Sequence, residues 1–125
     1  AAVLLLDTSF LSALWREERA RHAGPAVALL RAHAVRRTIV SMVAAGEYLE
    51  WQGATPEGLH FLRRHTLIGL SMPIAERAAL MQRRLARRLG ENDAWLAATA
   101  LHHGFTLVTA DSDFDRVPRL KLLLL

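Results

Sequence analysis

Residues 91–114 constrain the fold of this chain more than any other stretch. An Ala-rich segment that starts at Asn92 or Asp93 and stops at Gly104 predicts a helix, with the Asp93 carboxylate in the first turn, where the helix dipole favours it. The short apolar run 106–109 has the composition of a strand that is buried on both faces. Such strands are typical of parallel sheets covered by helices, so the stretch predicts an α/β fold.

Acidic residues follow two of the predicted strands. The apolar run 1–6 reads as a first strand, and Asp7 comes directly after it. Asp111 and Asp113 come just after the strand at 106–109. Because open parallel sheets bind ligands at the carboxyl ends of their strands, we expect these carboxylates to line one cleft.

The rest of the chain alternates between helical and strand patterns. This alternation predicts a three-layer α/β sandwich, a single domain over residues 1–125, with a central parallel sheet of about four or five strands flanked by helices. The other expected elements are a helix capped by Thr8 or Ser9, a helix from Pro25 to Ala34, a strand at 38–40, a helix from Ser41 to about Trp51, a helix opening at Pro56, a strand at 66–70, a helix from Pro73 to Leu89 or Gly90, and a last strand at 120–125.

The composition excludes several classes of protein. With 52% hydrophobic residues the chain can bury a core, and without cysteine it can form neither disulfides nor thiolate metal sites. No apolar run approaches the roughly 18–20 residues of a membrane span, and the opening run is too short for a signal sequence, so we expect a cytoplasmic protein without a membrane partner. The net charge of +4, carried almost entirely by arginine, is consistent with a polyanionic partner.

The acids indicate the chemistry. Glu47 lies in an otherwise apolar helix, where a glutamate is rarely buried without a partner. If Asp7, Glu47, Asp93 and the acids at 111 and 113 share a cleft, their like charges raise one another's pKa, so the cluster must hold protons or a cation. Hard oxygen ligands favour Mg²⁺ or Mn²⁺, and metal-assisted phosphodiester hydrolysis is the natural reaction class.

Each feature also has a structural interpretation. Asp7 and Asp93 suit helix starts in any protein, and one of the two loop acids suits a turn. A receiver domain would need paired acids after the first strand, and a haloacid-dehalogenase-type phosphatase would need an acid where Ser9 stands. The arginines at 83, 84, 87 and 88 form either a solvated helix face or an RNA-binding surface. The acids taken as solvated surface charges are Glu17, Glu18, Glu57, Glu76 and Asp115.

Four motifs together resemble PIN-domain proteins, and among them the VapC-type toxins of toxin–antitoxin pairs. The resemblance covers essentially the whole chain, and the motifs occur in the family's order. They are Leu5-Leu6-Asp7-Thr8-Ser9, residues 41–47, Asn92-Asp93-Ala94-Trp95-Leu96-Ala97-Ala98-Thr99-Ala100, and Leu107-Val108-Thr109-Ala110-Asp111-Ser112-Asp113-Phe114.

The resemblance implies a Mg²⁺- or Mn²⁺-dependent endoribonuclease that forms a homodimer and is blocked by a cognate antitoxin. The implied catalytic and metal-binding acids are Asp7, Glu47, Asp93 and Asp111, with Asp113 as a secondary ligand and Thr8 and Thr109 as polar residues beside the metal. The alternative is a catalytically silent PIN-like module that binds RNA or a protein.

Overall fold

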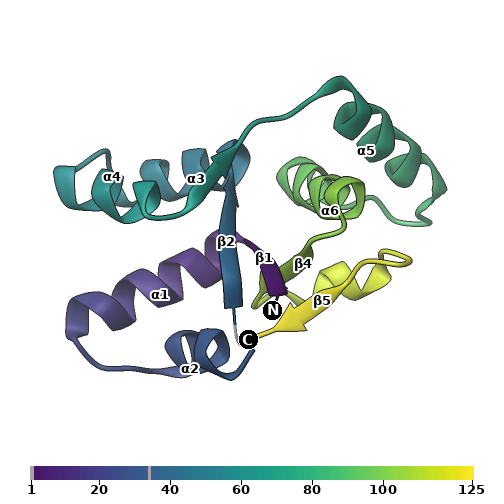
Figure 1. Ribbon diagram of the computed structural model, residues 1–125. Coiled ribbons are helices and arrows are strands. Elements are labelled where there is room, and N and C mark those ends of the chain that lie inside the picture. The colour runs from purple at the N-terminus through teal and green to yellow at the C-terminus, as the bar shows by residue number, and fades with distance from the viewer. Residues whose placement is uncertain (1, 34) are drawn as a thin grey trace.

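The computed structural model describes residues 2–33 and 35–125, and it has an α/β fold (Figure 1). Five parallel strands form one sheet in the order β3-β2-β1-β4-β5, which confirms the predicted fold class. Ala1 and Ala34, expected in the first strand and the second helix, lie outside the described residues. The elements are β1 (Ala2–Leu6), α1 (Thr8–Ala20), α2 (Pro25–Ala32), β2 (Val35–Ser41), α3 (Met42–Gln52), α4 (Pro56–Arg63), β3 (Thr66–Ile68), α5 (Met72–Arg84), α6 (Glu91–His103), β4 (Thr106–Thr109), the 3₁₀ helix η1 (Ser112–Arg116) and β5 (Leu122–Leu124).

Helices cover both faces of the sheet. Along the central strand β1, Leu4 and Leu6 pack with residues of α1, α2, α3 and α4, whereas Leu5 packs with residues of α5 and α6. All three leucines are fully buried, as the alternation of side chains in a doubly covered strand requires. Among the described residues, none of the helices is both long enough and apolar enough to span a membrane.

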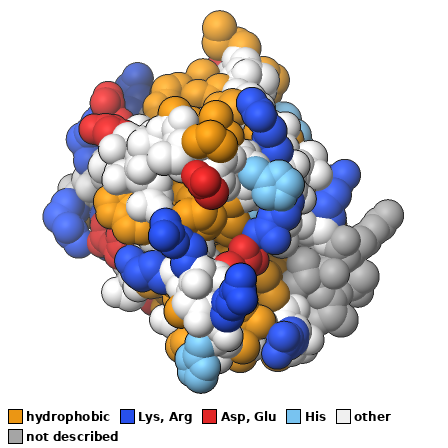
Figure 2. Space-filling view, turned by 90° about the vertical axis from the view of Figure 1, so that its left-hand side faces the viewer, with side chains coloured by type: hydrophobic (Ala, Val, Ile, Leu, Met, Phe, Trp, Pro, Cys, Tyr) orange, Lys and Arg blue, Asp and Glu red, His pale blue; other side chains and the backbone are white. Residues whose placement is uncertain are grey.

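The surface over α1, α2 and α4 mixes basic and apolar side chains (Figure 2). It includes a groove of about 520 Å³ between α1 and α4. The guanidinium groups of Arg19 and Arg64 lie over the rings of Trp15 and Phe61 in this groove, at 5.6 and 5.2 Å from the ring centroids. None of the five candidate acids lines the groove, so it is separate from the predicted site.

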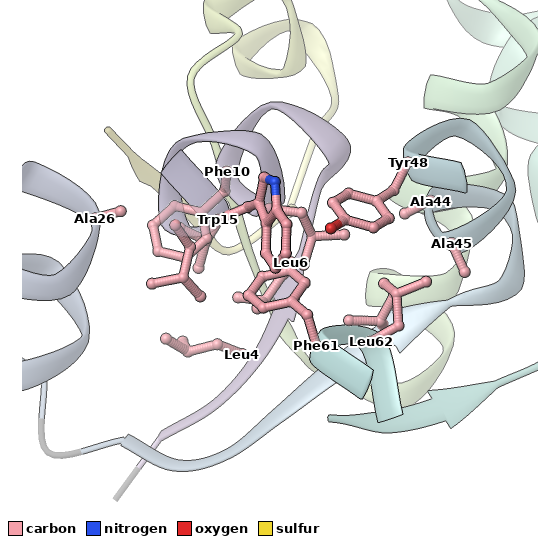
Figure 3. Close-up of a cluster of buried hydrophobic side chains, with 14 of the residues drawn as sticks. Leu4, Leu6, Phe10, Trp15, Ala26, Ala44, Ala45, Tyr48, Phe61 and Leu62 are labelled. Atoms are coloured by element: carbon pink, nitrogen blue, oxygen red, sulfur yellow. The ribbon is translucent and has the colours of Figure 1, made fainter. Parts of the chain in front are cut away.

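An aromatic cluster fixes α1, α3 and α4 relative to one another (Figure 3). The ring centroids of Trp15 and Phe61 are 5.2 Å apart, and those of Tyr48 and Phe61 are 5.5 Å apart. Tyr48 and Phe61 are almost completely buried. Because burial of Tyr48 fixes the rotation of α3 about its axis, it also sets the direction of the preceding residue, Glu47.

Asp7 caps the N-terminus of α1, so the expectation of a Thr8 or Ser9 cap is wrong. The Asp7 carboxylate accepts a hydrogen bond from the backbone N–H of Thr8 at 2.6 Å, and Thr8 and Ser9 form the first turn. A carboxylate satisfies a free N–H group at a helix start better than a hydroxyl does, because its charge also interacts with the helix dipole. The predicted Ser41 cap of α3 is confirmed, with the backbone N–H of Val43 donating to the Ser41 hydroxyl at 3.1 Å.

Helix α6 begins at Glu91, and its capping position is Gly90, which has no side chain to offer. Asp93 therefore lies inside the first turn rather than at the cap. The helix ends at Gly104, as predicted, in the left-handed conformation with φ of 73° that glycine adopts readily. Because Asp93 is not needed as a cap, its carboxylate is available to the cleft.

Three elements are shorter than the sequence predicts. Helix α5 ends at Arg84, not at Leu89 or Gly90. The buried side chain of Gln82 hydrogen-bonds both the backbone N–H and the carbonyl of Leu89, so the chain folds back instead of continuing the helix. Strands β3 and β5 span only Thr66–Ile68 and Leu122–Leu124, because their pairing with β2 and β4 covers three residues each.

Glu17 is not the solvated surface charge that the sequence suggested. Its carboxylate accepts hydrogen bonds from the backbone N–H groups of Gly24, Ala26 and Val27 at 2.7, 2.9 and 3.0 Å. It therefore caps α2 from the neighbouring helix. Burial raises the pKa of Glu17, but the hydrogen bonds from the three backbone N–H groups lower it by a larger amount. The pKa therefore lies below its ordinary value.

Replacing Glu17 with alanine is expected to lower the free energy of unfolding by about 2 kcal/mol at neutral pH, because three helix-start N–H groups lose a charged acceptor. Since the folded pKa of Glu17 is lowered, its stabilisation is present above the pKa of the unfolded chain and is lost as pH falls through the folded pKa. Urea denaturation at pH 7 measures the loss. Glu18→Ala is the matched control, because its ion pair with Arg64 is exposed and contributes less than about 1 kcal/mol. Equal losses in the two variants would contradict the capping role.

Candidate active site

Asp7 lies where β1 ends, and both of its carboxylate oxygens are bound. Oδ1 accepts the Thr8 N–H, and Oδ2 accepts the hydroxyl of Thr109 at 2.6 Å. The residue is only 6% exposed. Burial raises the pKa of Asp7, the hydrogen bonds from Thr109 and Thr8 offset part of that rise, and the charge of Glu47 raises it again. Asp7 is thus a buried carboxylate fixed between β1, α1 and the end of β4.

Thr8 links α1 to the acid of α3. Its hydroxyl donates a hydrogen bond to Oε1 of Glu47 at 2.8 Å, across 39 positions of sequence. The side chain of Glu47 is partly buried. Glu47 therefore faces the carboxyl edge of the sheet, on the same side as Asp7.

Asp93 projects from the first turn of α6 toward the other acids. Burial raises its pKa to about 6, and the negative charges of Asp7, Asp111, Glu47 and Asp113 add to that rise, in this order of size. Within residues 2–33 and 35–125, no arginine or lysine forms an ion pair with Asp7, Glu47 or Asp93. The cluster therefore carries negative charge that nearby cationic side chains do not neutralise.

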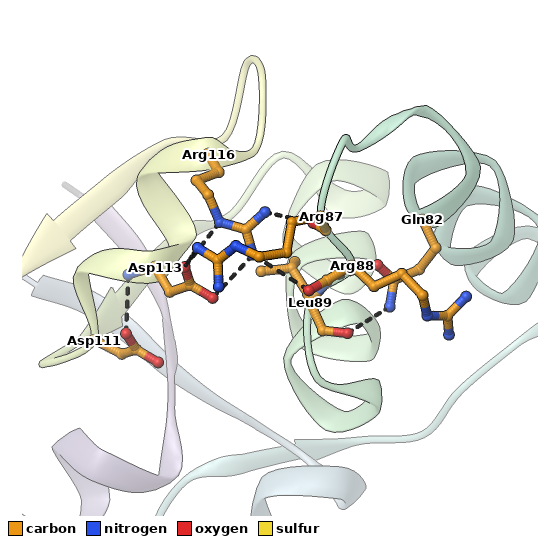
Figure 4. Close-up of polar contacts among 7 residues, drawn as sticks. All are labelled: Gln82, Arg87, Arg88, Leu89, Asp111, Asp113 and Arg116. Carbon is orange, nitrogen blue, oxygen red and sulfur yellow. Dashed lines mark hydrogen bonds and ion pairs between the residues drawn. The ribbon is translucent and has the colours of Figure 1, made fainter.

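The two acids after β4 have different surroundings (Figure 4). The backbone N–H of Asp111 donates to the Thr109 hydroxyl at 3.0 Å, and Oδ1 of Asp111 accepts the N–H of Asp113 at 2.9 Å. The carboxylate of Asp113 instead binds Arg116 through both oxygens, at 2.8 and 3.0 Å, and Arg87 at 3.3 Å. The hydrogen bond from Arg116 is the main cause that lowers the pKa of Asp113. Asp111 is thus the loop acid that keeps a carboxylate oxygen for the cleft.

Ser9 is a member of the site that was not among the site residues predicted from the sequence. Its hydroxyl lies 3.3 Å from Oδ2 of Asp7 and 3.2 Å from the hydroxyl of Thr109, and it accepts the backbone N–H of Ala110 at 3.0 Å. It therefore joins the start of α1 to the end of β4. Its place two residues after Asp7 is the only sequence signal for this role.

The donor set fits a hard divalent cation. Carboxylate oxygens are the ligands that Mg²⁺ and Mn²⁺ prefer, and no arginine or lysine among the described residues pairs with Asp7, Glu47 or Asp93. In the described part of the chain, no three Asp, Glu, His or Cys side chains are close enough to enclose a metal ion. The acids thus share an edge of the sheet without forming a closed ligand cage.

The four arginines proposed for RNA contact do not share one helix face. Arg83 and Arg84 end α5, whereas Arg87 and Arg88 lie in the segment that follows. Arg83 and Arg88 line a groove between α5 and α6, while Arg84 lines a different groove beside η1 and β5. Arg87 pairs with Asp113. A continuous helix would have aligned them, so their separation follows from the early end of α5.

The pKa of Asp93 predicts how stability depends on pH without metal. The folded chain binds a proton on the Asp93 carboxylate more tightly than the unfolded chain does. The ionised carboxylate therefore destabilises the fold above about pH 6, and this loss of stability disappears as pH falls toward 4. In EDTA, Asp93→Asn is therefore expected to stabilise the protein by on the order of 1 kcal/mol at pH 7.5 and by much less at pH 4.5. Thermal unfolding of the wild type and the variant at the two pH values measures the stabilisation. A stabilisation of the same size at both pH values would contradict the raised pKa of Asp93.

Comparison with known proteins gives consistent matches. A curated relative, ribonuclease VapC4 of Mycobacterium tuberculosis, is 31% identical to this chain over 64 residues. The match covers 49% of this chain and 49% of the relative, which is about half the length of that protein. The solved structure of VapBC2 from Rickettsia felis, bound to a DNA fragment from their promoter, has a TM-score of 0.80 at 21% identity and covers 98% of both chains. A toxin–antitoxin complex from Klebsiella pneumoniae has a TM-score of 0.71 at 22% identity and covers 98% of this chain and 96% of that one.

The family model described as PIN domain matches residues 4–120, which include all five candidate acids. At 21 and 22% identity the solved structures establish the fold alone, and they agree with the family model on it. The chain therefore belongs to the PIN domain family.

Proposed function

We propose that this chain is a metal-dependent endoribonuclease that acts as the toxin of a VapC-type toxin–antitoxin pair. The observation that carries the proposal is the gathering of acids at the ends of β1 and β4, where the Thr8 hydroxyl binds Glu47 and the Thr109 hydroxyl binds the buried Asp7. The raised pKa of Asp93 agrees with this arrangement. Similarity to ribonuclease VapC4 supports the choice of RNA as substrate. Structural protein cores do not gather unneutralised carboxylates in this way, because their mutual repulsion destabilises the fold.

The residues that would hold Mg²⁺ or Mn²⁺ are Asp7, Glu47, Asp93 and Asp111. Such an ion supplies an activated water and stabilises the charge on the departing oxygen. The protein's own contribution is to hold the acids in place. The Thr109 hydroxyl and the backbone N–H of Thr8 each bind one oxygen of Asp7. The Thr8 hydroxyl binds one oxygen of Glu47, and the other oxygen accepts no hydrogen bond from the described residues. These contacts reduce the freedom that the ligands would otherwise lose on binding the ion.

Arginine supplies the contacts to RNA in this proposal. The chain has a net charge of +4, and Lys121 is its only lysine. The exposed guanidinium groups of Arg83, Arg84 and Arg88 are placed around α5 and the segment before α6, and arginine binds phosphate in a bidentate manner. Arg87 has a weaker claim because it pairs with Asp113.

The proposal includes partners. The solved structures similar to this chain include VapBC2 and a toxin–antitoxin complex, which supports a cognate antitoxin that blocks the cleft. A homodimer and a cytoplasmic location, where cellular RNA is accessible, complete the proposal.

Cleavage of total RNA by the purified protein tests the proposed function. We expect discrete fragments with Mn²⁺ or Mg²⁺, none with EDTA, and none from an identically purified Glu47→Gln variant, which controls for contaminating nuclease. Wild-type protein should also melt at a higher temperature when Mn²⁺ is added, because an ion that binds only the folded chain stabilises it. No cleavage and no change in melting temperature would overturn the proposal in favour of a silent binding module.

A further inference from the structure

The segment between α5 and α6, residues 85–90, is held in place by two side chains (Figure 4). Gln82 binds the backbone of Leu89 with an N–H···O distance of 2.8 Å in one direction and 2.9 Å in the other. Arg116 of η1 donates to the carbonyl oxygens of Arg87 and Arg88. The second contact joins this segment to the loop that follows β4.

Asp113 in turn anchors Arg116. Its two oxygens accept hydrogen bonds from Nε and Nη2 of Arg116 at 2.8 and 3.0 Å. The side chain of Arg116 is 25% exposed, whereas that of Arg87, the other cation at Asp113, is 74% exposed. A bidentate pair with a partly buried guanidinium is the more rigid of the two contacts.

This arrangement occupies every nitrogen of the Arg116 guanidinium. Nε and Nη2 bind Asp113, and Nη1 and Nη2 bind backbone carbonyls. Four of the five N–H groups of Arg116 are thus engaged, and one N–H of Nη1 has no partner among the described residues. Both oxygens of Asp113 are bound by guanidinium groups, whose positive charge competes with that of a metal ion, whereas the oxygens of Asp7 accept only from neutral N–H and O–H groups. Oδ2 of Asp111 accepts no hydrogen bond from the described residues.

The two segments that Arg116 joins carry acids of the proposed site. Residues 85–90 lead directly into α6, where Asp93 lies in the first turn. The loop on the other side carries Asp111, whose Oδ1 accepts the backbone N–H of Asp113. The distance between the two acids therefore depends on the contacts that Arg116 makes.

We propose that Arg116 is a positioning residue for the cleavage reaction. Anchored by Asp113, it holds residues 85–90 against the loop after β4 and so fixes Asp93 relative to Asp111. Asp113 belongs to this bridge and is not a metal ligand. The inference rests on the proposed function for its effect on catalysis, but its effect on metal binding can be measured without RNA.

The test compares Arg116→Gln, Asp113→Asn and the double variant with the wild type. Arg31→Gln is the control, because it removes the same charge from an exposed position on α2. Cleavage of a synthetic RNA that contains the site found in total RNA gives kcat and KM. Titration with Mn²⁺, in which electron paramagnetic resonance reports the free ion, gives metal affinity without RNA.

For Arg116→Gln we expect kcat to fall roughly 10- to 100-fold and Mn²⁺ affinity about tenfold, as for other residues that orient metal ligands. KM for RNA should stay within about twofold. Asp113→Asn should behave in the same way, and the double variant should lose no more than either single one, because all three break the same bridge. Arg31→Gln should match the wild type.

Two results would overturn the inference. A raised KM with unchanged kcat would make Arg116 an RNA contact, and losses that multiply in the double variant would make Asp113 an independent ligand. If Arg116→Gln does not fold, Arg116→Lys replaces it, because lysine keeps the charge near Asp113 but cannot bind both carbonyls as well. If the wild type binds Mn²⁺ but cuts no RNA, the proposed function fails and the Mn²⁺ affinities alone decide the inference. A wild type that binds no Mn²⁺ overturns both.

Discussion

Asp93→Asn is expected to abolish metal-dependent RNA cleavage without unfolding the protein. The substitution keeps the size of the side chain but removes the charge that Asp7, Asp111 and Glu47 face. The loss in kcat should exceed the roughly 100-fold typical of residues that only orient ligands, because Asp93 is proposed to contact the ion itself. The measurement is single-turnover cleavage with saturating Mn²⁺, together with melting curves in EDTA and in Mn²⁺.

The melting curves separate this role from a structural one. In EDTA the variant should melt at or above the wild-type temperature, because one of several repelling charges is gone. Added Mn²⁺ should raise the melting temperature of the wild type more than that of the variant. A large loss of stability in EDTA would instead identify Asp93 as a structural part of the α6 start, and the catalytic assignment would fail.

Leu96→Ala, three residues further along α6, is expected to have the opposite effects. Leu96 is completely buried and belongs to the cluster that also contains Leu6 and Val108. Its truncation leaves a cavity and should lower the free energy of unfolding by about 3 kcal/mol. For a domain of this size the melting temperature should fall by roughly 10 °C. Cleavage at 20 °C, expressed per folded molecule, should stay within about twofold of the wild type.

The matched control is Leu80→Ala on α5, where the leucine is 48% exposed. This change should alter stability by less than about 0.5 kcal/mol, because a truncated surface side chain leaves no cavity. Chemical denaturation of both variants gives the comparison. Similar losses would mean that the packing of α6 against the sheet is not as described.

The sequence was sufficient to predict the parts of the site that depend on regular structure. Asp7 follows an apolar strand, so its place at the carboxyl edge of the sheet was expected. That Glu47 faces the same edge was only a condition of the hypothesis, and its hydrogen bond with Thr8 meets that condition. Asp93 was expected in the first turn of its helix, and it lies there. A parallel sheet of about four or five strands was likewise expected from alternating strands and helices, and the sheet has five.

Contacts between a side chain and the backbone of another element could not be predicted in the same way. Glu17 was taken for a surface charge because its three partners lie on the next helix, and no local pattern indicates that approach. Arg116 binds carbonyls that are free only because α5 ends at Arg84, and that early end depends on the contact between Gln82 and Leu89. Each of these contacts requires the fold to be known first.

The hydrogen bond between Thr109 and Asp7 joins residues 102 positions apart, across adjacent central strands. During translation, the start of the chain leaves the ribosome long before the strand that completes this contact. A nascent or truncated chain that lacks β4 has Asp7 and Glu47 but neither Thr109 nor Asp111, and so cannot assemble the full cluster. The proposed ribonuclease activity therefore requires that β4 has been synthesised, and a chain that stops before β4 is expected to lack it.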